Sequence, residues 1–165
     1  MERHIYHHET IDGSLVDVLG IMGTWPTEIL GPYVDLTGST DDPIHRLQAH
    51  FAGSDVSKRV VISHEDLEEL APGTHRMRIS WHAIDHTGMY PVMTGELEVT
   101  GLSTAPPRCE VAFLGHYRPP LGFVGAIADR VVGHRIAQEA VNGFVRDVCR
   151  RVTTSLDEHS TAGAA

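Results

Sequence analysis

Cysteine is scarce and long apolar runs are missing in this sequence of 165 residues. Its two cysteines, Cys109 and Cys149, are too few for a disulfide-stabilised scaffold, and such low usage is typical of a reducing compartment. No run of about 18 apolar residues, the length that a membrane-spanning helix needs, occurs in the chain. Residues 1–9 lack the apolar stretch of a secretory signal. We therefore expect a cytoplasmic protein without integral association with a membrane.

Basic residues are also few. The chain has 13 Lys and Arg residues against 22 Asp and Glu residues, which gives a net charge of −9 at pH 7. Proteins that bind nucleic acids usually carry a basic surface that replaces the counterions of the phosphates. Here no basic run is longer than Arg150–Arg151. We therefore expect no nucleic-acid partner and little attraction to anionic membranes.

The short motifs of several large enzyme classes are missing too. The chain contains no Gly-x-Ser-x-Gly motif, no phosphate-binding loop and no dinucleotide-binding fingerprint. Histidine is frequent, with 12 residues, and His4, His7 and His8 lie close together in the sequence. On a strand, however, His4 and His8 face one side and His7 the other, without cysteine or carboxylate at ligand spacing. We expect neither a metal site nor a cofactor.

The overall composition indicates one globular domain. Hydrophobic residues make up 41% of the chain and charged residues 21%, which are ordinary values for a globular protein. A chain of this length buries roughly 70% of its unfolded surface on folding, so it needs no disulfide or metal for a stable core. The last residues are small, polar and aperiodic. We expect a single domain over residues 1–152 and a flexible tail over residues 153–165.

The N-terminal quarter of the chain predicts one strand and two short helices. Residues 3–11 mix β-branched and aromatic residues with polar ones, as half-buried strands do. Ser14 is a suitable N-cap for a helix over residues 14–22. Residues 25–30 predict a second short helix or turn, and the turn-rich residues 35–44 predict a loop.

Alternating apolar and polar residues predict an antiparallel meander in the middle of the chain. The alternation is clearest over residues 74–85, where Met77, Ile79 and Trp81 share one face. Only one face of such a sheet is buried, so another element must cover its apolar side. The predicted strands span residues 47–51, 58–64, 74–85, 90–100 and 108–117.

Several polar groups in this region have a structural interpretation. Arg76, Arg78 and His82 alternate with the apolar residues and are expected on the solvated face of the sheet. The acidic residues 65–69 predict a solvated connection. Residues 101–107 predict a turn.

Apolar residues then recur at helical spacing from Val124 to Val152. A helix of about 30 residues is roughly 45 Å long, enough to cross a whole sheet. Gly133 lies within it and favours a kink. Residues 117–120 predict a rigid turn into this helix, with Tyr117 bracing the corner. We expect the helix to cover the apolar face of the sheet.

The segment that joins the last strand to this helix has a specific sequence. It reads Gly-His-Tyr-Arg-Pro-Pro-Leu-Gly-Phe-Val-Gly-Ala-Ile-Ala-Asp-Arg over residues 115–130 and Gly-His-Arg-Ile-Ala over residues 133–137. With the order of the elements, this segment resembles bacterial proteins of the SRPBCC superfamily, also called START-like or Bet v 1-like, which includes the polyketide cyclase/dehydrase type. The resemblance covers residues 74–152 well and residues 1–70 in topology only. It implies an α+β helix-grip fold, with a curved antiparallel sheet of six or seven strands, two short helices after the first strand and a long C-terminal helix packed across the sheet.

The resemblance also implies a function. A curved sheet that grips a helix encloses a cavity, which suits a small hydrophobic, lipid- or polyketide-like ligand. We favour the binding or carriage of such a ligand without catalysis, although a solid core would use the same residues as a cavity wall. The candidate ligand-binding residues are Met77, Ile79, Trp81, Met93, Leu97, Phe113, Val141 and Phe144.

Two other functions stay open. A polyketide cyclase or dehydratase would need two titratable groups that converge inside the cavity, and the candidates are Tyr90, His116 and Asp85. A module that binds a protein partner without a ligand would have a filled core and an exposed apolar patch of roughly several hundred Å². The sequence does not decide the ligand, the oligomeric state or whether residues 31–56 form a lid.

Overall fold

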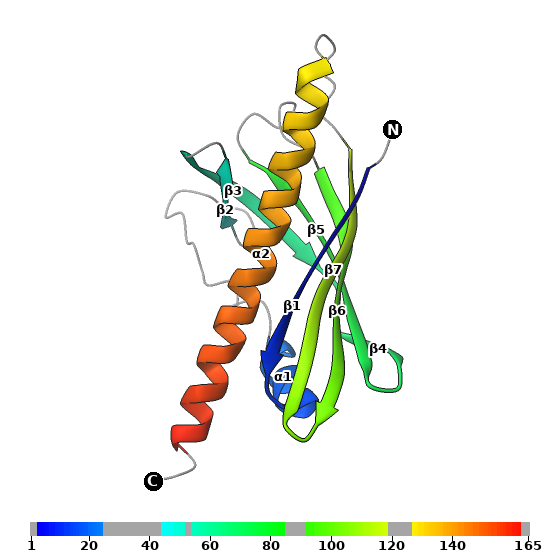
Figure 1. Ribbon diagram of the computed structural model, residues 1–165, viewed down its shortest axis with the longest axis vertical. Coiled ribbons are helices and arrows are strands. Elements are labelled where there is room, and N and C mark those ends of the chain that lie inside the picture. The colour runs from blue at the N-terminus through cyan, green and yellow to red at the C-terminus, as the bar shows by residue number, and fades with distance from the viewer. Residues whose placement is uncertain (1–2, 25–43, 52–53, 85–91, 119–126, 163–165) are drawn as a thin grey trace.

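The computed structural model describes residues 3–24, 44–51, 54–84, 92–118 and 127–162. In this part of the chain seven strands form one antiparallel sheet, and a long helix lies across it (Figure 1). This arrangement confirms the predicted α+β helix-grip fold. The elements are, in chain order, β1 (Arg3–Asp12), α1 (Leu15–Met22), β2 (Ile44–Phe51), β3 (Ser54–His64), β4 (Glu68–Ala71), β5 (Thr74–Ala83), β6 (Val92–Thr104), β7 (Pro107–Arg118) and α2 (Ile127–Ala162).

The strand order brings the two halves of the chain together. Across the sheet the order is β1-β7-β6-β5-β3-β2, and β4 pairs with β5 beside this path. The first strand therefore pairs with the last, in continuous register from Arg3↔Tyr117 to Asp12↔Arg108. The sheet is complete only when both β1 and β7 are in place.

The long helix reaches from one edge of the sheet to the other. Its backbone approaches β1 and β2, the two edge strands, and also β7, whereas within the described residues it does not approach β3, β5 or β6. The sheet curves around the helix between these edges (Figure 1). Large side chains must therefore fill the space between the central strands and α2.

The strand register arranges the side chains that face α2 in rows across the sheet. One row contains Arg3, Tyr117, Met93, Trp81 and Ile62, each opposite the next on the neighbouring strand. The last four are buried, and Arg3 is half-buried. We term these five residues the Trp81 row. It arises because every second residue of a strand points to the same face.

The neighbouring row has no side chains at its centre. There Gly115 of β7 lies opposite Gly95 of β6, and we term these two residues the glycine pair. The ring of Phe113 lies over both residues. A Cβ atom on Gly95 would be 2.6 Å from Phe113 Cζ and 2.6 Å from the carbonyl oxygen of Leu114. Glycine is required here because the ring takes the space of a Cβ atom.

The short helix α1 closes one end of the space between the sheet and α2. Ser14 caps it, because its hydroxyl accepts a hydrogen bond of 3.2 Å from the backbone N–H of Asp17. Val18 and Met22 pack into the core. This confirms the helix predicted over residues 14–22. Since β1 runs directly into α1, the helix lies at the opposite end of the sheet from the Trp81 row.

At its C-terminal end, α2 is longer than the sequence predicts. Residues 153–162 continue the helix, so the expectation of a flexible tail over residues 153–165 is wrong for them. Leu156 packs against the core, and its Cδ1 would be 2.8 Å from a Cβ atom on Gly13. The hydroxyl of Thr154 donates to the carbonyl four residues earlier at 2.9 Å. One apolar contact and local hydrogen bonds thus extend a segment that lacks an apolar periodicity.

Two predicted connections are partly strand. β4 occupies Glu68–Ala71 and pairs with β5, although residues 65–69 were expected to be a solvated connection. β6 continues to Thr104 and β7 begins at Pro107, so the turn expected over residues 101–107 contains two residues. In both places the backbone ladder extends through exposed residues, which a pattern of apolar side chains does not reveal.

Some predictions concern residues outside the described ranges. They are the second short helix or turn at 25–30, most of the loop at 35–44, and the candidate catalytic residues Asp85 and Tyr90. Among the described helices, none combines the length and the hydrophobicity that a membrane span requires.

Substitution of the glycine pair should destabilise the fold. Gly95→Ala is expected to lower the free energy of unfolding by about 1–3 kcal/mol, because its Cβ atom overlaps the Phe113 ring and a backbone carbonyl. Gly20→Ala is the control: Gly20 is exposed in α1 and an added Cβ atom meets nothing within 4 Å, so it should stabilise by about 0.5–1 kcal/mol. Urea unfolding measures both. Wild-type stability of Gly95→Ala would mean that the ring does not lie there.

The end of α2 should contribute to stability. Leu156→Ala is expected to lower the free energy of unfolding by about 1–2 kcal/mol, because it removes an apolar side chain that packs against the core. Glu158→Ala, at an exposed position of the same helix, should change it by less than about 0.5 kcal/mol. Thermal unfolding compares the two variants. Identical melting temperatures would contradict the packing of this segment.

Candidate functional site

The residues predicted to bind a ligand lie together on the face of the sheet and helix that forms the interior. All of them are buried, with exposed fractions of 4% or less, and all belong to one hydrophobic cluster. The structure thus brings them together, while their contact with a ligand stays a prediction. They are Met77, Ile79 and Trp81 of β5, Met93 and Leu97 of β6, Phe113 of β7, and Val141 and Phe144 of α2.

Three aromatic rings fill the space between the central strands and α2. The ring centroids of Trp81 and Phe144 are 5.1 Å apart, those of Trp81 and Phe113 are 5.3 Å apart, and those of Phe113 and Phe144 are 6.2 Å apart. These separations are typical of favourable aromatic pairs. Each ring comes from a different element: Trp81 from β5, Phe113 from β7 and Phe144 from α2. We term these three residues the aromatic cluster.

A polar group lies at the end of the interior away from α1. Tyr117 is 2% exposed, and its hydroxyl lies 3.4 Å from Nδ1 of His134 on α2. The two rings stack with centroids 6.0 Å apart. Arg3 lies opposite Tyr117 on β1 and forms a hydrogen bond with its phenol. We term these three residues the Tyr117 group.

The surroundings of Tyr117 keep its phenol neutral. Burial raises the pKa of Tyr117, and the charge and hydrogen bond of Arg3 offset part of this effect. The phenol is therefore protonated at neutral pH. In its contact with Nδ1 of His134 either group can be the donor, depending on the tautomer of the imidazole. A donor–acceptor distance of 3.4 Å is longer than that of a well-made hydrogen bond.

Sequence reasoning placed Tyr117 at a corner and did not include Arg3 or His134 among the site residues. The strand and helix periodicities nevertheless place all three residues on inward-facing positions. The strand period of two places Tyr117 on the helix-facing side of β7, and the same period does so for Arg3 on β1. His134 precedes the buried Ala137 by three residues and therefore belongs to the inner stripe of α2.

The candidate catalytic residue His116 lies on the other face of the sheet. Successive side chains of a strand point to opposite faces, and its neighbour Tyr117 points inward. His116 lines a groove on the outer face together with His4. The prediction that His116 lies inside the cavity is therefore wrong. Asp85 and Tyr90, the other two candidates, lie outside the described residues.

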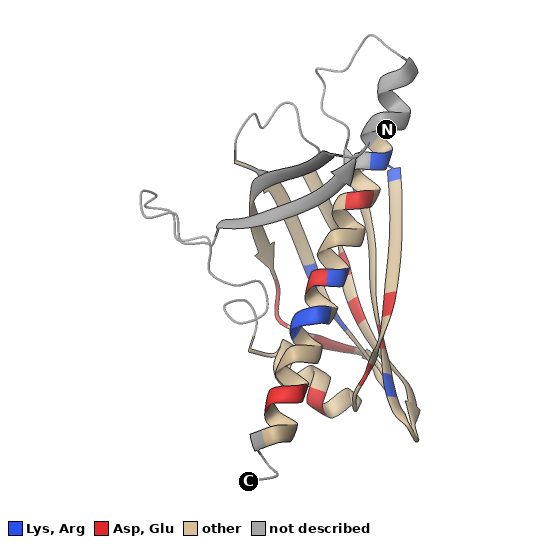
Figure 2. Ribbon diagram, turned by 60° about the vertical axis from the view of Figure 1, so that its left-hand side comes forward, with Lys and Arg blue, Asp and Glu red and all other residues tan. Residues whose placement is uncertain are grey.

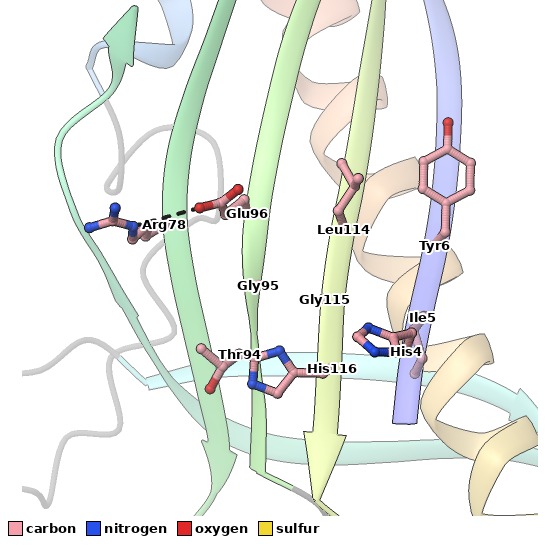
Figure 3. A pocket seen from close by; sticks show the side chains of 10 residues that line it. All are labelled: His4, Ile5, Tyr6, Arg78, Thr94, Gly95, Glu96, Leu114, Gly115 and His116. Atoms are coloured by element: carbon pink, nitrogen blue, oxygen red, sulfur yellow. Dashed lines mark ion pairs between the residues drawn. The ribbon is translucent and has the colours of Figure 1, made fainter. Parts of the chain in front are cut away.

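This outer groove has a volume of about 610 Å³ and extends from β1 across β7 and β6 to Arg78 of β5 (Figure 3). Backbone of the glycine pair and Ile5 forms part of its lining, and two rows of outward side chains flank it. The groove combines imidazole, hydroxyl, apolar and charged groups on a solvated face. One row consists of His4, His116 and Thr94, and the other of Tyr6, Leu114, Glu96 and Arg78.

The outer face also carries ion pairs. Arg76 Nε lies 2.8 Å from Glu68, and Arg78 Nη1 lies 3.2 Å from Glu65. The hydrogen bond with Glu68 is the main cause that raises the pKa of Arg76, and neighbouring carboxylates add to it. His82 is exposed on the same face. These positions confirm that Arg76, Arg78 and His82 belong to the solvated face.

The two cysteines are not activated nucleophiles. Both are buried and free, as expected for structural residues. Burial raises the pKa of Cys109, and burial with the nearby charge of Glu9 raises that of Cys149 to about 12. A thiol that stays protonated at neutral pH is a poor nucleophile. Within the described ranges, no group of three or more His, Cys, Asp or Glu side chains is placed to hold a metal ion.

Comparisons with known proteins show the fold. No protein-family model matches the sequence, and no curated protein matches it either. Solved structures match over nearly the whole chain. A protein from Thermus thermophilus is 14% identical, with a TM-score of 0.52 over 93% of this chain and 99% of that one.

Two further matches have names that state an activity. The Zhui aromatase/cyclase from a Streptomyces species is 13% identical, with a TM-score of 0.51 over 92% of this chain and 94% of that one. Truncated norcoclaurine synthase from Thalictrum flavum is 10% identical, with a TM-score of 0.53 over 94% of each chain. At these identities the matches show a common fold, the helix-grip arrangement described above, and nothing further.

Stability should fall in alkali. The folded pKa of Cys149, about 12, lies above the ordinary value of 9.0, so the unfolded chain loses this proton first. The stability contributed by the protonated thiol is therefore complete below pH 9 and is lost as the pH rises toward 12. Cys149→Ala should flatten this decline, as urea unfolding at successive pH values would show. An unchanged decline in the variant would contradict the burial of this thiol.

Proposed function

We propose that this protein binds a small hydrophobic molecule between the inner face of the sheet and α2. The observation that carries this proposal is the path of α2, which approaches the edge strands and β7 but, among the described residues, not β3, β5 or β6. Protein interiors are close-packed, so the space between must be filled by side chains or by a ligand. Its walls are apolar, which suits a hydrophobic molecule.

The aromatic cluster is the part of the interior best suited to make room for a ligand. Phe113 lies over the glycine pair and contacts Trp81 and Phe144. A change of its rotamer would uncover the backbone of Gly95 and Gly115 and open space for about one ring beside α2. An apolar ring or chain of a ligand would then replace the contacts that Phe113 loses.

A catalytic role would build on the same site. Two of the structural neighbours are named as a cyclase and a synthase. A reaction of this type would need an acid and a base in contact with the substrate, and Tyr117 and His134 are titratable groups that meet in the interior. Because ligand binding is a condition for both roles, it is the function proposed here.

We also propose that the protein acts in the cytoplasm on a small molecule rather than on nucleic acid. Its net charge of −9 and its two free, buried cysteines support this. Figure 2 shows that the ribbon positions of Lys and Arg residues are interspersed with those of Asp and Glu residues along α2 and over the sheet. Such a mixed surface does not favour a polyanionic partner.

Fluorescence of Trp81 tests ligand binding directly. The chain contains two tryptophans, so Trp25→Phe leaves Trp81 as the only one. Titration of this variant with the apolar dye anilinonaphthalenesulfonate should give saturable energy transfer from Trp81 to bound dye. An excess of decanol should displace the dye. Dye that does not bind, or that binds without energy transfer from Trp81, would overturn the proposal.

A blocking substitution tests the location of the ligand. Ala137→Phe adds a ring on the buried side of α2, whereas Thr153→Phe adds the same ring at an exposed position of that helix. We expect Ala137→Phe to weaken dye binding about tenfold or more, which corresponds to roughly 1.4 kcal/mol, and Thr153→Phe to leave it unchanged. Ala137→Leu replaces the first variant if its melting is not cooperative. Equal affinities in the inner and outer variants would contradict binding beside α2.

A further inference from the structure

The Trp81 row links a polar end of the interior to its apolar middle. Arg3 and Tyr117 lie at one end of this row, and Met93 and Trp81 follow on β6 and β5. His134 reaches Tyr117 from the opposite wall, formed by α2. A molecule that lies along this row would therefore meet a polar group at one end and an apolar surface over the rest of its length.

The Tyr117 group presents hydrogen-bond donors. The guanidinium of Arg3 has N–H donors and no acceptor. The contact between Tyr117 and His134 leaves one further donor in either tautomer of the imidazole: Nε2–H when Nδ1 accepts from the hydroxyl, and the hydroxyl itself when Nδ1–H donates to it. Donors of this kind, one of them cationic, complement an acceptor oxygen that carries negative charge. Such charge-assisted hydrogen bonds are about twice as strong as neutral ones.

The contact between Tyr117 and His134 is long, and Tyr117 is buried. The contact between the Tyr117 hydroxyl and His134 Nδ1 is 3.4 Å, which is long for a hydrogen bond. Polar contacts in a ligand-free site are often long and tighten when the ligand is bound. Tyr117 is also 2% exposed, so a hydrogen bond made to it is screened from competing water.

We propose that Arg3, Tyr117 and His134 bind the carboxylate, or a comparable anionic oxygen group, of an amphipathic ligand whose apolar body lies on Met93 and Trp81. This inference rests on the proposed function, because it requires a ligand between the sheet and α2. The inference narrows the ligand class from hydrophobic molecules in general to amphipathic acids, which have an apolar body and an anionic head group. Neutral molecules of the same shape would bind by their apolar body alone.

A pair of probes that differ in the head group tests the inference. Decanoate and decanol have the same apolar chain, and isothermal titration calorimetry measures the affinity of each for the full chain. Decanoate is expected to bind about tenfold more tightly than decanol, because hydrogen bonds to a charged group are worth more than those to a neutral one.

Variants then assign this preference to the Tyr117 group. Arg3→Gln and His134→Gln are expected to weaken decanoate binding about tenfold while leaving decanol binding nearly unchanged. Arg78→Gln is the matched control, because it removes a positive charge from the outer face of the same sheet. It should leave both affinities as they are in the wild type.

The outcomes separate this inference from the proposed function. If both probes bind equally well to the wild type, or if Arg3→Gln and His134→Gln weaken the two probes to the same extent, the anionic head-group site is wrong and ligand binding stands. If neither probe binds, ligand binding between the sheet and α2 is itself contradicted, and the inference falls with it. A preference for decanoate that only Arg78→Gln abolishes would place the head group on the outer face and overturn the inference.

Discussion

The pairing of β1 with β7 is the contact on which the rest of the structure depends. It joins residues that lie far apart in the chain, from Arg3↔Tyr117 at one end to Asp12↔Arg108 at the other. This register places α1 at the closed end of the interior and brings Arg3 beside Tyr117. It also forms the edge on which α2 rests, where Gln138 donates a hydrogen bond of 3.1 Å to the carbonyl of Tyr6.

The distance between the sheet and the α2 backbone differs between this edge and the central strands. Near β1 the helix backbone is close to the sheet, whereas over β5 and β6 the distance is bridged by large side chains. The glycine pair allows Phe113 to lie against the backbone there. Large rings over a bare stretch of sheet, followed by a polar group at the end of the Trp81 row, give the interior an apolar body and a polar end. The proposed amphipathic ligand has the same two parts.

Much of the fold could be predicted from the sequence because its strands and helix have strong periodicities. The alternation in β5 to β7 identified the buried faces, and all eight residues predicted to line the interior are in its core. The helical end over residues 153–162 was missed because Leu156 meets Gly13, a contact between residues far apart in the chain. The Tyr117 group was missed for a similar reason. It combines β1, β7 and α2, and no local pattern indicates that Arg3 and His134 meet the same phenol.

The central claim is that a ligand binds between the central strands and α2 and replaces contacts that the aromatic cluster makes there. Methyl NMR of methionine-labelled protein tests this claim most directly. Met93 and Met77 face this space from β6 and β5, whereas Met22 belongs to α1 and is buried at the closed end. At saturating decanoate, the account predicts large shifts of the Met93 and Met77 methyl resonances and little change at Met22. Unchanged Met93 and Met77 resonances at saturation would contradict it.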